Sequence, residues 1–257
     1  MKYLPACILL LFAASCNNKA PVDMVGAYSL NTQTLNDGSR DSTIDRKQLK
    51  IYTNGYFMYA SPNVADSFAN FGIGKYKVEG DKLHEYRFYT AEAGDKLDTF
   101  VVTINKNPDG YQQVIENMNL SGKDYKLTES YQTTSREAKS QLDGAWKQVK
   151  NVYVRKAGDS SVNNNPLEYK VYQSGYFIWA ITVQDSTKRK TSVFGYGPFE
   201  MVGANKLKET VANTTFVSGL LGKTYEVDIE FPNPDTYRQT ITFANGDKSV
   251  EVYQRLK

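Results

Sequence analysis

Glu85 and Glu209 are the acidic residues best placed for chemistry, because they recur at matched positions in two similar halves of the chain. Each follows a Phe-Gly-x-Gly segment, on a predicted strand. If they point into a barrel, each is a buried acid awaiting a ligand amine, a hydroxyl or a structural arginine, and burial would raise its pKa. The alternative, which the sequence favours, is a structural carboxylate hydrogen-bonded to a neighbouring Tyr or Lys.

Catalysis and metal binding find little support elsewhere in the chain. His84 is its only histidine and Lys208 takes its place in the second half, which excludes a multi-histidine zinc site and limits a histidine-dependent triad to one half. We expect His84 to be a surface strand residue. A glycosidase needs two carboxylates flanking one bond, and each half supplies one candidate. The sequence therefore predicts no catalytic residues, no metal and no cofactor.

Aromatic side chains form the second group of candidate ligand-binding residues. Tyr59 and Trp179 occupy matched positions, as do Tyr28 and Trp146. Tyr59 and Trp179 end a stripe that could stack on a sugar, anchor a protein partner, or pack one half against the other, and these three alternatives stay open. The stripe comprises Tyr52, Phe57 and Tyr59 in the first half and Tyr172, Phe177 and Trp179 in the second.

The N-terminus has the pattern of an export signal. A basic start, a short apolar run and three small residues precede Cys16, and the run is shorter than the roughly 20 residues of a membrane-spanning helix. The segment resembles a lipobox, although Ala13 stands where leucine is usual. We therefore expect a lipoprotein signal peptide over residues 1–15, lipid on Cys16 that inserts in the bilayer, and a tether over 16–21. The tether lacks an acidic run, so we expect an outer-membrane lipoprotein of the bacterial envelope facing the periplasm.

An internal repeat organises the rest of the chain. Residues 51–60 (IYTNGYFMYA) match residues 171–180 (VYQSGYFIWA), 120 positions later. Further blocks follow in the same order: 71–74 with 194–197, 82–85 with 206–209, and 107–113 with 233–239. The repeat predicts two copies, over residues 22–134 and 141–257, joined by a polar linker over 135–140.

Each copy reads as a series of strands. Val, Ile, Thr, Tyr and Phe alternate with polar residues, and long amphipathic helices are absent, which predicts an all-β fold of two tandem antiparallel barrels. Asn54-Gly55 and Ser174-Gly175 suit two-residue hairpin turns. In each hairpin the more apolar face looks like the core side, and which face points into the barrel stays open. This face comprises Leu49, Ile51, Tyr56, Met58 and Ala60 in the first copy, and Tyr169, Val171, Tyr176, Ile178 and Ala180 in the second.

These blocks resemble a known family. Gly144-Ala145-Trp146 is similar to the Gly-x-Trp signature that opens lipocalin and related calycin barrels, with Tyr28 replacing the tryptophan in the first copy. The hairpin block, the Phe-Gly-x-Gly segment and Glu209 also resemble uncharacterised lipocalin-like proteins that bacteria secrete or anchor by lipid. The resemblance implies a barrel that holds one small apolar ligand in its mouth.

Composition narrows the classes of partner. Thirty-one basic and 28 acidic residues, mostly interspersed, give a formal net charge of +3, which offers no case for nucleic acid. The leading hypothesis is a non-enzymatic, membrane-anchored lipoprotein that binds a small apolar ligand or an envelope partner. The second is a protein-interaction module with filled barrels, and the third is a carboxylate-dependent hydrolase.

Overall fold

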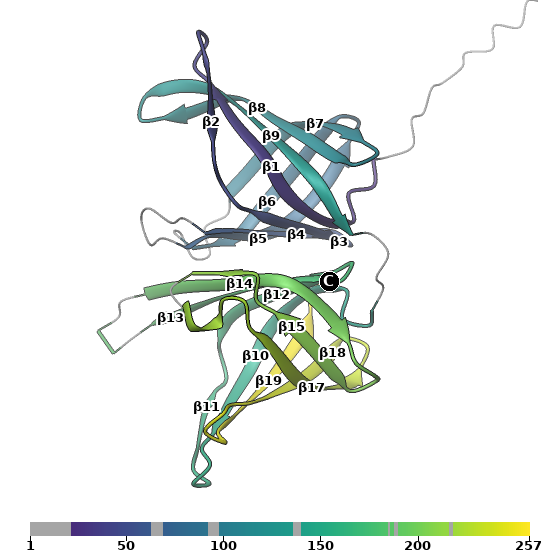
Figure 1. Cartoon of the computed structure of the whole chain (residues 1–257), viewed down its shortest axis with the longest axis vertical. Coiled ribbons are helices and arrows are strands. Elements are labelled where there is room, and N and C mark those ends of the chain that lie inside the picture. The colour runs from purple at the N-terminus through teal and green to yellow at the C-terminus, as the bar shows by residue number, and fades with distance from the viewer. Residues whose placement is uncertain are drawn as a thin grey trace, which may run out of the picture.

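The computed structural model describes residues 22–62, 69–91, 98–135, 140–184, 186–187, 190–215 and 218–257. The predicted signal peptide, Cys16 and the tether lie outside the described residues, as does most of the predicted linker. The described chain forms two closed, eight-stranded antiparallel β-barrels in tandem (Figure 1), as the sequence predicted.

The first barrel closes where β1 pairs with β9. The short β2 extends β1 beyond the ring. Its strands are β1 (Gly26–Asn36), β2 (Asp41–Ile44), β3 (Leu49–Thr53), β4 (Tyr56–Pro62), β5 (Ala69–Glu79), β6 (Lys82–Thr90), β7 (Asp98–Asn107), β8 (Gly110–Leu120) and β9 (Lys123–Ser135).

The second barrel repeats this topology and closes where β10 pairs with β19. β11 extends β10, and β16 pairs with β14 off the main path. Its elements are β10 (Gly144–Val154), β11 (Ser160–Asn163), β12 (Leu167–Gln173), β13 (Tyr176–Gln184), β14 (Lys190–Met201), β15 (Lys206–Thr210), β16 (Asn213–Thr214), the 3₁₀ turn η1 (Ser218–Leu220), β17 (Thr224–Asn233), β18 (Thr236–Thr242) and β19 (Lys248–Arg255).

The two predicted hairpin turns are confirmed. Thr53 pairs with Tyr56 across Asn54-Gly55, and Gln173 pairs with Tyr176 across Ser174-Gly175. In the second turn both central residues have positive φ, 54° and 78°, which is the backbone that a type I′ turn requires. The turns fix the register of β3 with β4 and of β12 with β13.

The more apolar hairpin face is buried in both copies, but it points out of its own barrel. Leu49, Ile51, Met58 and Ala60 point out of the first barrel and pack against Val171, Ile178 and their neighbours from the second. Figure 1 shows β3, β4 and β5 lying against β12, β13 and β14. Equivalent residues meet there, since Phe71 and its repeat counterpart Phe194 have ring centroids 6.4 Å apart. The apolar face therefore forms the interface between the barrels.

The opposite hairpin face lines the barrel interiors, so the aromatic stripe neither covers the outer surface nor joins the two copies. Tyr52 and Phe57 pack with Tyr28 and Tyr111 in a buried cluster, which Met24 helps to fill. Trp146, Tyr172, Phe177 and Tyr237 form the same cluster in the second barrel, with Leu142. Each barrel is thus plugged by aromatic side chains in one part of its interior.

The Phe-Gly-x-Gly segments make room for two of the candidate aromatic residues. A Cβ on Gly72 would lie 2.7 Å from the ring of Tyr59 on the neighbouring strand, and a Cβ on Gly195 would lie 2.7 Å from Trp179. Glycine at these positions lets each ring lie across the inner surface of the sheet. The repeated glycines therefore position Tyr59 and Trp179 inside their barrels.

Candidate functional site: two barrel cavities

A buried ion pair crosses the interior of the first barrel. The Nζ of Lys50 lies 2.6 Å from a carboxylate oxygen of Glu85 and 3.2 Å from Oε1 of Gln113. Tyr52 donates its hydroxyl to the same Glu85 oxygen at 2.6 Å. Burial above all, and then the charge of Glu85, raise the pKa of Tyr52, so the hydroxyl stays protonated as a donor.

The second barrel repeats this arrangement residue for residue. Lys170 lies 2.7 Å from Glu209, and Tyr172 donates to Glu209 at 2.6 Å. Gln239 accepts a hydrogen bond from Lys170 at 3.4 Å. Both lysines are only 2% exposed, and such burial requires a charged partner. We call each group of lysine, glutamate, glutamine and tyrosine the lysine–glutamate floor.

The floor decides between the two interpretations of Glu85 and Glu209. Both carboxylates are buried inside their barrels, and each is bound by a Tyr and a Lys of its own barrel. That is the structural arrangement which the sequence favoured. The sequence interpretation missed Lys50 and Lys170, although each lies between apolar residues at matched positions, a pattern that could have identified a buried cation.

A second carboxylate lies beside each floor, and sequence reasoning missed it too. Glu129 of β9 accepts hydrogen bonds from Gln33 (2.6 Å), Gln113 (2.5 Å) and Tyr131 (3.0 Å). Tyr131 in turn accepts a hydrogen bond from Nε2 of Gln48. All three contacts to Glu129 come from donors, because Gln33 and Gln113 use their side-chain amide groups and Tyr131 uses its single hydroxyl proton.

The corresponding network in the second barrel contains one more acid. Glu251 accepts hydrogen bonds from Gln239 (2.5 Å), Tyr253 (2.8 Å) and Ser249 (2.9 Å). Glu168 stands where the first barrel has Gln48 and lies 2.7 Å from the hydroxyl of Tyr253. A repeated Glu-x-Tyr, at Glu129 and Glu251, is the sequence signal that could have revealed both networks.

Glu168 is held as the neutral acid at physiological pH. Burial first, and the nearby charge of Glu251 second, raise its pKa to about 8. The hydrogen-bond geometry supports the same protonation state. The hydroxyl of Tyr253 lies within 2.8 Å of the carboxyl groups of both Glu168 and Glu251. Because Tyr253 has a single hydroxyl proton, one of the two hydrogen bonds needs a proton from a carboxyl group.

Next to the hydrogen-bond network of Glu129 or Glu251, each barrel contains a cavity that side chains do not fill. The first cavity has a volume of about 310 Å³. Tyr59 lines it, and Arg87 donates to the Tyr59 hydroxyl at 2.8 Å while also pairing with Asp98. Arg46, Lys50, Glu85 and Glu129 complete its charged lining.

The second cavity has a volume of about 230 Å³ and more apolar walls. Trp179 replaces Tyr59, and Val211 replaces Arg87. The remaining apolar lining comes from Ile181, Leu220, Tyr225, Val227, Ile241 and Phe243. Tyr28 and Trp146, also expected to bind ligand, lie in the aromatic plugs and line neither cavity.

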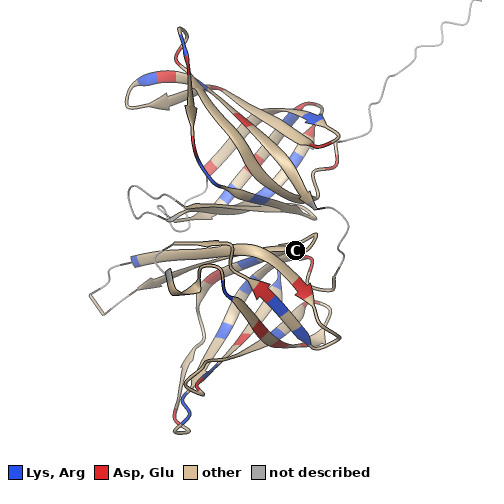
Figure 2. Ribbon diagram, in the orientation of Figure 1, with Lys and Arg blue, Asp and Glu red and all other residues tan. Residues whose placement is uncertain are grey.

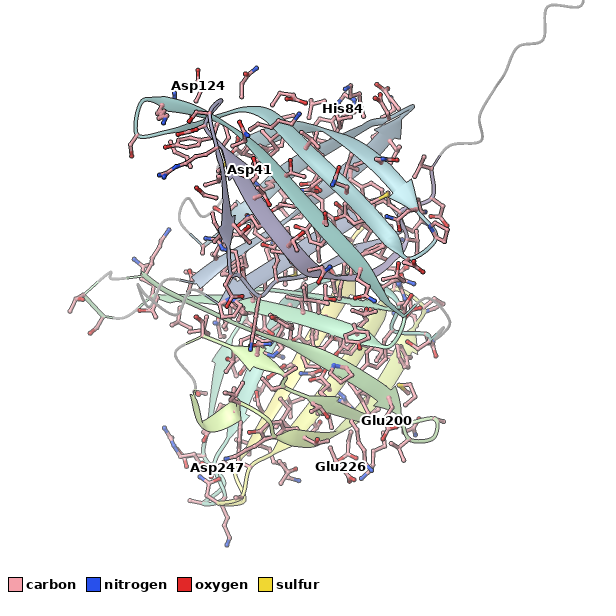
Figure 3. All side chains as sticks on the ribbon, turned by 45° about the horizontal axis from the view of Figure 1, so that its top comes forward. Asp41, His84, Asp124, Glu200, Glu226 and Asp247 are labelled. Atoms are coloured by element: carbon pink, nitrogen blue, oxygen red, sulfur yellow. The ribbon has the colours of Figure 1, made fainter. Side chains whose placement is uncertain are left out.

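Two further hollows, of about 710 and 420 Å³, are lined by none of the candidate residues that the sequence predicted. His84 lies on the outside of the first barrel (Figure 3), with Nε2 3.3 Å from Glu79. Basic and acidic residues are interspersed along the strands of both barrels (Figure 2). No group of three metal-ligating side chains occurs in the described part of the chain. Within the same residues, no helix has the length and apolarity to cross a membrane.

Comparison with known proteins finds only weak structural similarities. No family model matches the chain, and no curated protein matches it. A redesigned β-barrel of known structure is 17% identical with a TM-score of 0.31, covering 48% of this chain and 98% of its own. A protein of unknown function from the DUF3598 family of Nostoc punctiforme is 8% identical with a TM-score of 0.27, covering 91% and 96%. Both likenesses are weak, so what the chain binds must be inferred from its own side chains.

Proposed function

We propose that this chain is a lipid-anchored, non-enzymatic binding protein whose two barrels each hold a small ligand. The observation that carries the proposal is the pair of cavities, about 310 and 230 Å³, in barrels that are otherwise plugged by aromatic side chains. Ligand sites are typically concave and mainly apolar, with a few polar groups that fix orientation. The second cavity has that composition, and the first is more polar.

Filling each cavity separately tests ligand binding. Ile115 and Ile241 are repeat counterparts that line the first and second cavities, so Ile115→Trp and Ile241→Trp should each block one barrel. Native mass spectrometry of the purified protein, before and after organic extraction, should show a bound small molecule that the matching variant lacks. Val101→Trp, at a position 52% exposed, is the control.

Protein that carries no extractable ligand, in the parent chain as in both filled variants, would count against this function. The same result would favour the second hypothesis, an interaction module with filled barrels. The aromatic stripe that motivated that hypothesis lies inside the barrels, and the repeated apolar face on the outside of each barrel is covered by the other barrel.

The membrane anchor is a separate part of the proposal. Its support is the sequence around Cys16. A diacylglyceryl group on the Cys16 thiol, together with an acyl chain on the new amino terminus, would hold the chain firmly at a bilayer. Cys16→Ala should release the protein from the membrane fraction into the soluble fraction, whereas Cys7→Ala should not. Retention of the Cys16→Ala protein in membranes would show that the anchor lies elsewhere.

A further inference from the structure

We propose that the second cavity binds a small organic amine, with its ammonium group held by Glu168 and Glu251 and its apolar body against Trp179. The inference rests on the proposed binding function and names the ligand class for one of the two barrels. The first observation is the balance of acidic and basic side chains, which differs between the two cavities although both contain the same lysine–glutamate floor.

The second cavity carries an uncompensated negative charge. Lys170 is paired with Glu209 at 2.7 Å. Glu251, 8% exposed, is bound only by the neutral donors of Gln239, Tyr253 and Ser249. Among the described side chains, neither Glu168 nor Glu251 forms an ion pair, and a buried charge without a counter-ion is costly. A ligand that brings a cation would supply it.

The groups that face Glu168 come from three strands. They are Lys170 on β12, Glu209 on β15, and Glu251 and Tyr253 on β19. This part of the cavity thus contains three carboxyl groups, those of Glu168, Glu209 and Glu251, and one lysine, so it favours an additional positive charge. An ammonium group can donate three hydrogen bonds, which suits a pair of carboxyls that share one proton.

Size and wall chemistry restrict the rest of the ligand. A cavity of 230 Å³ is somewhat larger than the roughly 150 Å³ that accommodates benzene. Trp179, Val211, Ile241 and Phe243 line it, and apolar and aromatic walls favour an apolar body. One ring with a short alkyl amine therefore fits, and 2-phenylethylamine is a suitable probe.

Binding of the amine is coupled to a proton. In the free protein Glu168 holds a proton, and a bound ammonium favours its carboxylate. The balanced step is protonated Glu168 plus R–NH₃⁺ giving the Glu168 carboxylate paired with R–NH₃⁺, plus one H⁺ released to solvent. Affinity should therefore rise with pH up to the Glu168 pKa of about 8, at most about tenfold per pH unit, while the amine stays protonated below about pH 9.

The first barrel supplies matched controls. Gln48 is the neutral counterpart of Glu168, so Glu168→Gln gives the second barrel the first barrel's residue. Arg87 occupies the position of Val211, so Val211→Arg places a cation beside the carboxyls and should abolish amine binding. Gln48→Glu adds an acid to the first cavity, where Arg46 and Arg87 stand nearby, and should create no amine site.

Isothermal titration calorimetry of the purified chain at pH 6, 7 and 8 tests the proposal, in two buffers with different ionisation enthalpies. We expect 2-phenylethylamine to bind at least tenfold more tightly than 2-phenylethanol or phenylacetate at pH 8, and to release protons. In Glu168→Gln the dependence on pH and the proton release should disappear. Thermal unfolding of each variant establishes that the barrel is intact.

Equal affinity for the amine and the alcohol, tighter binding of phenylacetate, or an unchanged pH profile in Glu168→Gln would each overturn the amine assignment. Those results leave the binding function standing. Absence of binding by all three probes also overturns the assignment, while the extraction experiment decides independently whether the barrels carry any ligand at all.

Discussion

The two barrels share one buried framework but differ in the charge of their cavities. Arg46, Lys50 and Arg87 line the first cavity against two glutamates. In the second, Lys170 is the only basic residue among the described lining, against three glutamates. The lysine–glutamate floor is common to both, whereas Gln48, Tyr59 and Arg87 of the first barrel become Glu168, Trp179 and Val211 in the second. The shared residues thus form the buried ion pairs and hydrogen bonds, and the three residues that differ change the charge and polarity of the cavity lining.

The largest expected effect tests the shared floor. Lys170→Met leaves the buried Glu209 without its cation and should lower the free energy of unfolding by about 3–5 kcal/mol, and Lys50→Met should do the same in the first barrel. Urea unfolding measures both. Lys77→Met removes the exposed pair with Glu79 and should leave the urea unfolding midpoint almost unchanged, because solvent screens exposed ion pairs.

Adding Glu209→Gln to Lys170→Met should recover most of the loss, because the double variant leaves no unpaired buried charge. If Lys50→Met and Lys170→Met differ widely, or if the second substitution recovers nothing, the two floors are not equivalent and the comparison fails.

A somewhat smaller loss of stability is expected from substituting the second glycine of each Phe-Gly-x-Gly segment, because the backbone of the neighbouring strand lies close to its Cα. A Cβ on Gly74 would lie 2.2 Å from the carbonyl oxygen of Tyr86, and one on Gly197 would lie 1.9 Å from that of Thr210. Alanine at either position should cost about 2–3 kcal/mol in thermal or urea unfolding, because strand backbone must move. Gly219→Ala, which meets no neighbour within 4 Å, should stay within about 0.5 kcal/mol of the parent.

The third prediction concerns the one acid that the barrels do not share. The pKa of Glu168 is raised from 4.5 to about 8 on folding, so its contribution to stability is fully present below pH 4.5 and is lost as pH rises toward 8. Relative to Glu168→Gln, the parent protein should lose at most about 1.4 kcal/mol per pH unit between pH 5 and 8. Parallel pH profiles for the two proteins would refute a neutral Glu168.

The smallest effect concerns Tyr59, which accepts a hydrogen bond from Arg87 in the first cavity. Tyr59→Phe should cost about 1 kcal/mol in urea unfolding, since it leaves a donor of the guanidinium without its partner. A double-mutant cycle with Arg87→Met should give a coupling energy of similar size. A cycle at the counterparts, Trp179→Phe with Val211→Ala, should give a smaller value because no polar contact joins them.

The sequence predicted the class of fold because the repeat, the strand alternation and the Asn-Gly and Ser-Gly turns are local signals. It did not predict which hairpin face points inward. Alternation identifies a core face only when the opposite face meets water, and every residue from Leu49 to Thr53 is buried. The outward residues pack against the other barrel, and the inward Lys50 is paired by Glu85. Contacts between residues remote in sequence therefore decided the orientation.

The candidate site was predicted in part. Glu85, Glu209, Tyr59 and Trp179 stood out because they recur, and the structure places all four on the lining of a cavity. Glu168 was missed because its importance comes from a difference between copies, opposite Gln48, and from its distance to Tyr253 across the closed barrel. Neither can be found by searching for matched residues alone.

The interface between the barrels uses the same face of each copy, so equivalent residues such as Phe71 and Phe194 meet across it. Two separate copies of one barrel could assemble in this way as a symmetric homodimer, but their cavities would then be identical, and the assembly would dissociate on dilution. Joining the copies in one chain fixes their effective concentration. It also removes the symmetry constraint, because a substitution in one cavity is no longer copied into the other. The fused chain is therefore free to carry two different cavities in a fixed ratio of one to one.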